Sequence, residues 1–173
     1  MSLEELRKQI NELDRKLVEL LNERARVVVE IGKLKSKDDS AIYAPDREKD
    51  VFTRLAEANK GPLPDKCLAA IWRELMSGSF VLERPLRIGY LGPEGSFSHT
   101  AALLKFGQSV EYESLAGITS VFEEVAKGHC DLGVVPIEKQ TIRLWRLAFS
   151  LHIFQGPGRH MFIPPKSWTT ASL

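Results

Sequence analysis

Residues 3–35 read LEELRKQINELDRKLVELLNERARVVVEIGKLK, and the apolar side chains in this stretch recur on alternating three- and four-residue steps. The residues in this series are Leu3, Leu6, Ile10, Leu13, Leu17, Leu20, Val27, Ile31 and Leu34. That spacing is typical of the a and d positions of a heptad, so it predicts one long amphipathic helix with an apolar seam.

Arg24 occupies the seam position that follows Leu20, where the pattern requires an apolar residue. A guanidinium buried there is destabilising unless an anion meets it. Arg7 and Lys35 lie on one flank of the same seam, near its two ends, so three cations border one apolar stripe. We interpret them as residues that bind a small anion. The alternative for Arg24 is that it snorkels to solvent or pairs with a glutamate.

A second helix is predicted from Pro45 to about Asn59, because proline suits the first turn of a helix. Arg47 and Glu48 lie in its first turn, on the face that continues into Val51. This pair is either part of the anion site or simply a solvated helix start.

A third helix is predicted from about Asp65 to Leu82. Its inward face is expected to carry Leu68, Ile71, Trp72, Leu75 and Leu82. Steps of four residues continue this face to Ser79 and Glu83, which are the polar groups on an otherwise apolar stripe. Gly78 weakens the helix there and would permit close packing or the approach of a ligand.

The length of the first helix favours an intertwined homodimer. At about 1.5 Å per residue, Arg7 lies roughly 25 Å from Arg24 and about 40 Å from Lys35 along one helix. Arg7 therefore cannot share a small ligand with the other two within one chain, whereas an antiparallel second copy would bring its Arg7 to them. Three helices of such unequal length also cannot close a core alone.

The composition excludes several function classes. The 173 residues carry 24 Lys+Arg against 23 Asp+Glu, which gives no general preference for nucleic acid or membranes. The sequence has no apolar run long enough to span a bilayer and no signal-peptide pattern at its charged start. Cys67 and Cys130 are expected to be reduced thiols of a cytoplasmic protein. The four histidines show no ligand spacing, so we expect no metal and no cofactor.

After residue 85 the pattern becomes that of an α/β domain. Strands are predicted at 86–91 and 132–135, with helices at about 101–106 and 117–127. The glycine- and hydroxyl-rich loop 92–100 is a weak candidate for an anion cradle. Residues 141–173 show no clear period and at most one helix, at 141–151, so the parallel sheet is expected to be incomplete.

The chain resembles two enzyme families in succession. Residues 1–84 resemble the all-helical chorismate mutase domain, through LRKQINELD at 6–14, LLNER at 20–24, EIGKLK at 30–35 and DRE at 46–48. Residues 85–140 resemble the start of a prephenate dehydratase domain, through GPEGSFSHTAA at 92–102 and DLGVVPIE at 131–138. The order is that of the bifunctional enzymes of phenylalanine biosynthesis.

The resemblance implies roles for the residues already singled out. Arg24, Lys35 and Glu83 would be catalytic, with Lys35 and Glu83 directed at the ether oxygen of chorismate. Arg7 would reach the site of the neighbouring protomer, Glu48 would bind the ring hydroxyl, and Arg47 and Ser79 would complete the substrate site.

The implied reaction is the Claisen rearrangement of chorismate to prephenate, which needs no cofactor or metal. Charge separates as the ether bond breaks, so fixed cations and donors beside the oxygen stabilise the transition state. Glu83 can donate a hydrogen bond only when protonated, so we expect mutase activity to fall as the pH rises.

The sequence departs from the dehydratase family after residue 138. It reads Lys139-Gln140 where an asparagine–serine–threonine–glycine stretch is expected, and the threonine–arginine–phenylalanine motif does not follow. Residues 141–173 are therefore expected to be an aberrant, poorly ordered tail, which arises either from a frameshift or from a genuine short variant. Dehydratase activity is expected to be absent or negligible. The alternatives are a bifunctional enzyme that retains both activities and a non-enzymatic helical dimerisation module.

Overall fold

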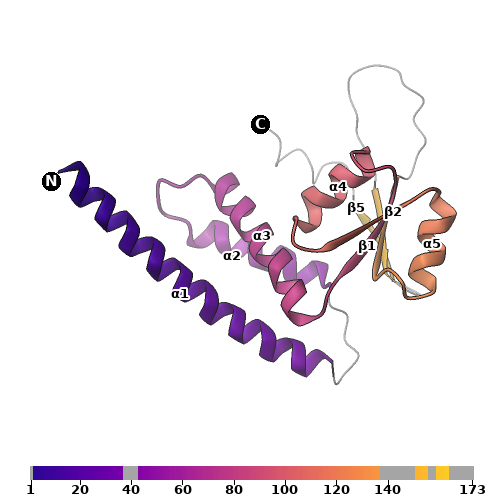
Figure 1. Cartoon of the computed structure of the whole chain (residues 1–173), viewed down its shortest axis with the longest axis horizontal. Coiled ribbons are helices and arrows are strands. Elements are labelled where there is room, and N and C mark those ends of the chain that lie inside the picture. The colour runs from indigo at the N-terminus through magenta and orange to yellow at the C-terminus, as the bar shows by residue number, and fades with distance from the viewer. Residues whose placement is uncertain (1, 37–42, 137–150, 156–158, 164–173) are drawn as a thin grey trace, which may run out of the picture.

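The helices of the N-terminal part form where the sequence predicts them. The computed structural model describes residues 2–36, 43–136, 151–155 and 159–163 (Figure 1). Its first three helices are α1 (Leu3–Lys35), α2 (Pro45–Ala58) and α3 (Asp65–Glu83). Ser2 and Glu5 cap α1 reciprocally, and Pro45 takes the first turn of α2. The three predicted helices are confirmed.

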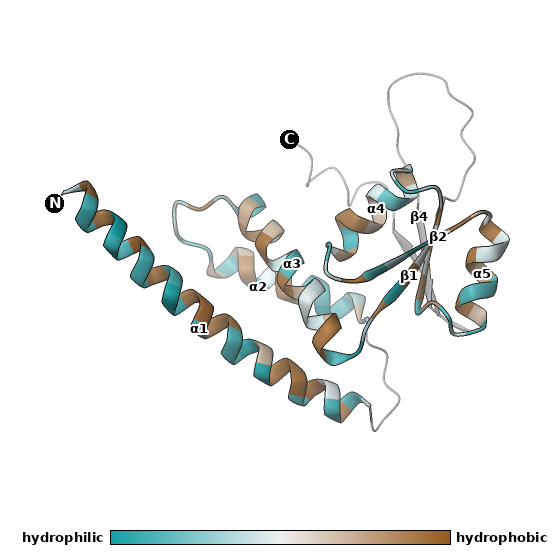
Figure 2. Ribbon diagram, in the orientation of Figure 1, coloured by the Kyte–Doolittle hydropathy of each residue, from teal (hydrophilic) through white to brown (hydrophobic). Residues whose placement is uncertain are grey.

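Helix α1 lies along one side of the molecule, and its N-terminal half extends beyond the other two helices (Figure 1). Its buried residues are Val28 and Gly32, which lie on the face toward α3 rather than on the seam. The seam itself is exposed, from 39% of the surface of Leu6 to 63% of that of Leu3. Figure 2 shows the resulting succession of apolar and polar residues along this helix.

The second part of the chain is a five-stranded sheet with the order β2-β1-β3-β4-β5. The strands are β1 (Arg87–Leu91), β2 (Glu111–Leu115), β3 (Leu132–Pro136), β4 (Leu151–Gln155) and β5 (Arg159–Ile163). The first three are parallel, and β4 and β5 are added in antiparallel fashion. None of the described helices has the length and apolar character needed to cross a bilayer.

Two helices cover the two faces of this sheet. Helix α4 (Phe97–Phe106) packs over Ile88 and Val134, and helix α5 (Ile118–Ala126) packs over Val135. Because successive residues of a strand point to opposite faces, Val134 packs on the α4 side of the sheet and Val135 on the α5 side. The predicted opening of an α/β domain is confirmed.

Three strands were not predicted. Strand β2 reads EYESL and is polar because it lies at the edge of the sheet, so the hydrophobic pattern did not reveal it. Strands β4 and β5 fall within residues 141–173, where the sequence pattern predicted no strand. They satisfy the backbone groups of β3, which would otherwise leave an unpaired edge.

The structure tests two further predictions only in part: a helix at 141–151 and the inward face of α3. The possible helix at 141–151 lies outside the described residues except for Leu151, which begins β4. On α3, Ile71 and Leu82 are exposed, and Ser77 and Ser79 are the buried residues instead. Ser77 is buried because it faces the α/β part, where its hydroxyl accepts a hydrogen bond from the Ser109 amide at 3.0 Å.

The helical and α/β parts share one apolar core. Tyr43, which precedes α2, is 4% exposed and belongs to the same buried cluster as Leu86, Ile88 and Phe106. Phe80 of α3 packs against this cluster. The two parts are therefore joined by packing as well as by the chain.

Candidate active site

The candidate site lies where α1 and α3 come close together. A Cβ atom added to Gly32 would lie 2.9 Å from the Cα atom of Glu83, so only glycine allows the two backbones this separation. Lys35 is one turn further along α1, and Ser79 is one turn earlier on α3. The close approach therefore brings side chains of α1 and α3 within hydrogen-bonding reach.

Arg24 and Ser79 form the first contact of the site. The Nη1 atom of Arg24 donates to Ser79 Oγ at 2.7 Å, and that hydroxyl donates to the Leu75 carbonyl at 2.7 Å. Burial and the neighbouring Arg47 both lower the pKa of Arg24, whereas Glu83 raises it. The guanidinium stays charged, because its ordinary pKa lies far above neutral pH. The half-buried Arg24 and the exposed Arg47 therefore create a positive potential beside Ser79.

Lys35 and Glu83 form the second contact. The Nζ atom of Lys35 donates to Glu83 Oε2 at 2.8 Å. The Glu83 side chain is 12% exposed and that of Lys35 is 31% exposed, so the pair is partly removed from solvent. This half-buried ion pair is stronger than one on the open surface, where solvent screens the charges.

Glu48 is held by different partners. Its Oε2 atom accepts hydrogen bonds from the Tyr43 hydroxyl at 2.8 Å and from Lys105 Nζ at 2.7 Å. Lys105 belongs to α4, in the α/β part. Glu48 thus stands at the boundary between the two parts of the chain.

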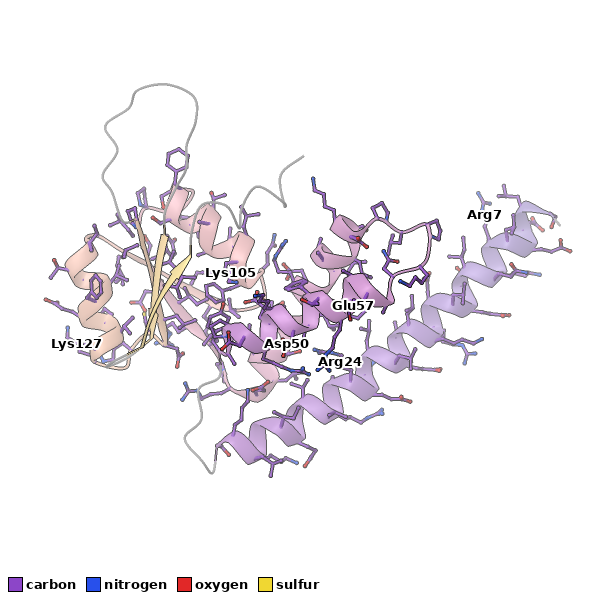
Figure 3. All side chains as sticks on the ribbon, turned by 180° about the vertical axis from the view of Figure 1, so that it is seen from behind. Arg7, Arg24, Asp50, Glu57, Lys105 and Lys127 are labelled. Carbon is purple, nitrogen blue, oxygen red and sulfur yellow. The ribbon has the colours of Figure 1, made fainter. Side chains whose placement is uncertain are left out.

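Arg7 does not join the other site residues. It lies near the N-terminal end of α1, exposed, and Figure 3 shows it at the far end of the helix from Arg24. The structure therefore brings together Arg24, Lys35, Ser79 and Glu83, with Arg47 close to Arg24. Arg7 is separate within one chain, as the helix geometry predicts.

Sequence reasoning missed three residues that shape the site: Gly32, Tyr43 and Lys105. A glycine inside a long helix of good helix formers was a usable signal for close packing, because it weakens the helix otherwise. No local pattern marked Tyr43 or Lys105, since their contacts depend on how the two parts of the chain pack.

Two family matches divide the chain at the boundary between the helices and the sheet. Residues 6–84 match chorismate mutase type II, and residues 88–142 match prephenate dehydratase. A bifunctional chorismate mutase/prephenate dehydratase of Stutzerimonas stutzeri is 43% identical over 144 residues, which are 80% of this chain and 40% of that protein. The enzyme of the same name from Escherichia coli K12 is 33% identical over 151 residues, covering 77% and 39% of the two chains. The chain thus spans about two fifths of the length of these relatives.

Solved structures of chorismate mutases are also similar to the chain. One from Thermus thermophilus is 34% identical and covers 47% of this chain and 92% of that one, with a TM-score of 0.46. One from Helicobacter pylori in complex with prephenate is 31% identical and covers 47% and 88%, with a TM-score of 0.44.

Proposed function

We propose that this chain, which belongs to the chorismate mutase type II family through residues 6–84 and carries a prephenate dehydratase segment at residues 88–142, rearranges chorismate to prephenate. The observation that supports this most is the half-buried Arg24, bonded to Ser79 and next to Arg47. Two cations held side by side are unfavourable unless an anion binds between them, and chorismate is a dianion.

The site residues would act by position and charge. Arg24 and Arg47 would bind a carboxylate and hold the substrate in the compact conformer from which the rearrangement starts. Lys35 would face the ether oxygen, where negative charge develops as the bond breaks, and so would stabilise the transition state more than the ground state.

Glu83 and Lys35 bond to each other at 2.8 Å in the described arrangement. On binding, the ether oxygen would take the place of one partner for each of them. The role proposed for Glu83 is to donate a hydrogen bond to that oxygen. The amide of a Glu83→Gln variant can make the same bond, so this variant should retain turnover of chorismate, and loss of turnover in it would contradict this role.

We further propose that the working unit is an antiparallel homodimer. Arg7 is too far along α1 to reach the site of its own chain, and the apolar seam of α1 is exposed. A second copy of α1 would cover the seam and supply its Arg7 to this site. A cytoplasmic location is in keeping with the two unpaired cysteines, Cys67 and Cys130.

Dehydratase activity is proposed to be absent, because Lys139-Gln140 replaces the polar motif expected after residue 138. The test is to incubate the purified chain with chorismate and measure prephenate and phenylpyruvate in the same samples. Prephenate without phenylpyruvate supports both proposals. Phenylpyruvate above the uncatalysed rate contradicts the loss of the second activity, and no turnover by the folded protein contradicts the mutase assignment.

A further inference from the structure

Glu48 receives its two hydrogen bonds from residues outside the helices that form the rest of the site. The Tyr43 hydroxyl donates from the segment before α2, and the Lys105 ammonium donates from α4. Both bonds end on Oε2 of the carboxylate, at 2.8 and 2.7 Å. Among the described residues no hydrogen bond ends on the other oxygen, Oε1.

Tyr43 packs against both α3 and α4, and Lys105 belongs to α4. The Tyr43 ring packs edge-on against Phe106 and Phe80, with centroids 5.2 and 6.2 Å apart. The Lys105 ammonium lies 5.8 Å from the centroid of the Tyr43 ring, within the range of a cation–π interaction. Ammonium, phenol and carboxylate thus form one connected group anchored on α4 and the shared core.

The burial of this group makes it more than a surface ion pair. The side chains of Lys105 and Glu48 are 25% and 15% exposed. Burial and the adjacent Glu48 raise the pKa of Tyr43, so the phenol stays a donor at all physiological pH values. Charge-assisted bonds that are partly shielded from water restrict the carboxylate to one orientation.

We propose that Lys105, a residue of the dehydratase-like segment, is a positioning residue for the mutase site. It holds Oε2 of Glu48 so that Oε1 faces the ring hydroxyl of chorismate. This inference rests on the proposed function and adds to it a part for the α/β region, which supports substrate recognition by the helical region.

The first experiment compares three variants of the full chain in steady-state turnover of chorismate. Lys105→Met keeps the aliphatic stem and removes the charge, and we expect it to raise KM about tenfold with little change in kcat, as loss of one charged hydrogen bond would. Lys105→Arg should restore KM to within about twofold of wild type, because a guanidinium can make the same bond. Lys127→Met, at the exposed end of α5, is the matched control and should leave both constants unchanged.

A second substrate separates positioning from a general structural effect. With the chorismate analogue that lacks the ring hydroxyl, Lys105→Met and wild type should have the same KM, because Oε1 then has nothing to bind. Likewise, adding Lys105→Met to a Glu48→Gln variant should have little further effect. These results would not arise if Lys105 only stabilised the fold.

The outcomes distinguish this inference from the proposed function. An active wild type whose KM is unchanged by Lys105→Met overturns the role of Lys105 and leaves the mutase assignment intact. An equal loss of activity with both substrates also overturns it, since the effect would then be structural. A folded wild type that does not turn over chorismate overturns the proposed function and this inference together.

Discussion

In the α/β region, Leu86, Ile88 and Val121 are completely buried, whereas along α1 every residue of the apolar seam is exposed. The sheet has helices on both faces and closes its core within one chain. The helical region has cations and a few buried residues at the crossing of α1 and α3, but its described residues form no closed core of their own. This difference supports the proposal that a second copy covers the exposed seam of α1, whereas the core of the α/β region is closed within one chain.

The largest expected effect tests whether the helical region, in which the seam of α1 is exposed, also carries the mutase activity. Arg24→Ala should lower kcat/KM for chorismate by about 10²–10³-fold, because the variant loses a fixed cation at the site. The free energy of unfolding should change by less than about 1 kcal/mol, since removing a buried charge offsets the lost hydrogen bond to Ser79. Arg26→Ala, on the exposed side of α1, is the matched control. Unchanged turnover with a more stable dimer would favour a purely structural helical module.

The next effect separates the two regions by their dependence on protein concentration. Ile88→Ala should reduce the free energy of unfolding by about 2–5 kcal/mol at every concentration, because its cavity forms within one chain. Leu17→Ala should instead lower the midpoint of thermal unfolding most at low concentration, because it weakens association between copies. Sedimentation and thermal unfolding over a wide range of concentration measure both. A concentration-independent effect of Leu17→Ala would show that the seam is not an interface.

A smaller effect concerns the crossing of the two helices. Gly32→Ala places a methyl group 2.9 Å from the Glu83 backbone, so α1 and α3 must separate. We expect kcat/KM to fall about 10- to 100-fold, because catalytic groups lose their geometry when displaced by about 1 Å. Gly78→Ala is the control on α3, where an added Cβ meets nothing within 4 Å, and it should stabilise the helix by about 0.5–1 kcal/mol. Equal activity in both variants would contradict the importance of the close approach.

The smallest expected effect is on the thermal stability of the α/β region. Hydrogen bonds from His129 and Lys127 lower the pKa of Glu124 below its ordinary value of 4.5. Its contribution to stability is therefore present above the ordinary value and is lost as the pH falls through the lowered one. Glu124→Gln should slightly reduce Tm at neutral pH and leave it unchanged in strong acid, whereas Glu123→Gln should have less effect at either pH. If Glu124→Gln reduced Tm more in acid than at neutral pH, the stabilising role of the ionised Glu124 would be contradicted.

The sequence alone predicted the elements that have a strong period and the residues that interrupt it. The three helices were predicted from the apolar seam of α1, the proline at the start of α2 and the apolar stripe of α3. Arg24, Ser79 and Glu83 were identified because they are polar residues on these apolar stripes. Strand β2 was missed because it is short and mostly polar, and β4 and β5 because pairing with β3 determines them. The contact between Lys105 and Glu48 depends on packing between the two regions, which no local pattern encodes.

The most direct test of the central claim, that the site is completed by a second copy, is complementation between two inactive variants. Arg7→Ala and Arg24→Ala should each have very low chorismate mutase activity, and each should dimerise. After subunit exchange, a mixed dimer has one site with both arginines intact, so an equal mixture should recover about a quarter of wild-type activity. A mixture that exchanges subunits and remains as inactive as its components would contradict the shared site.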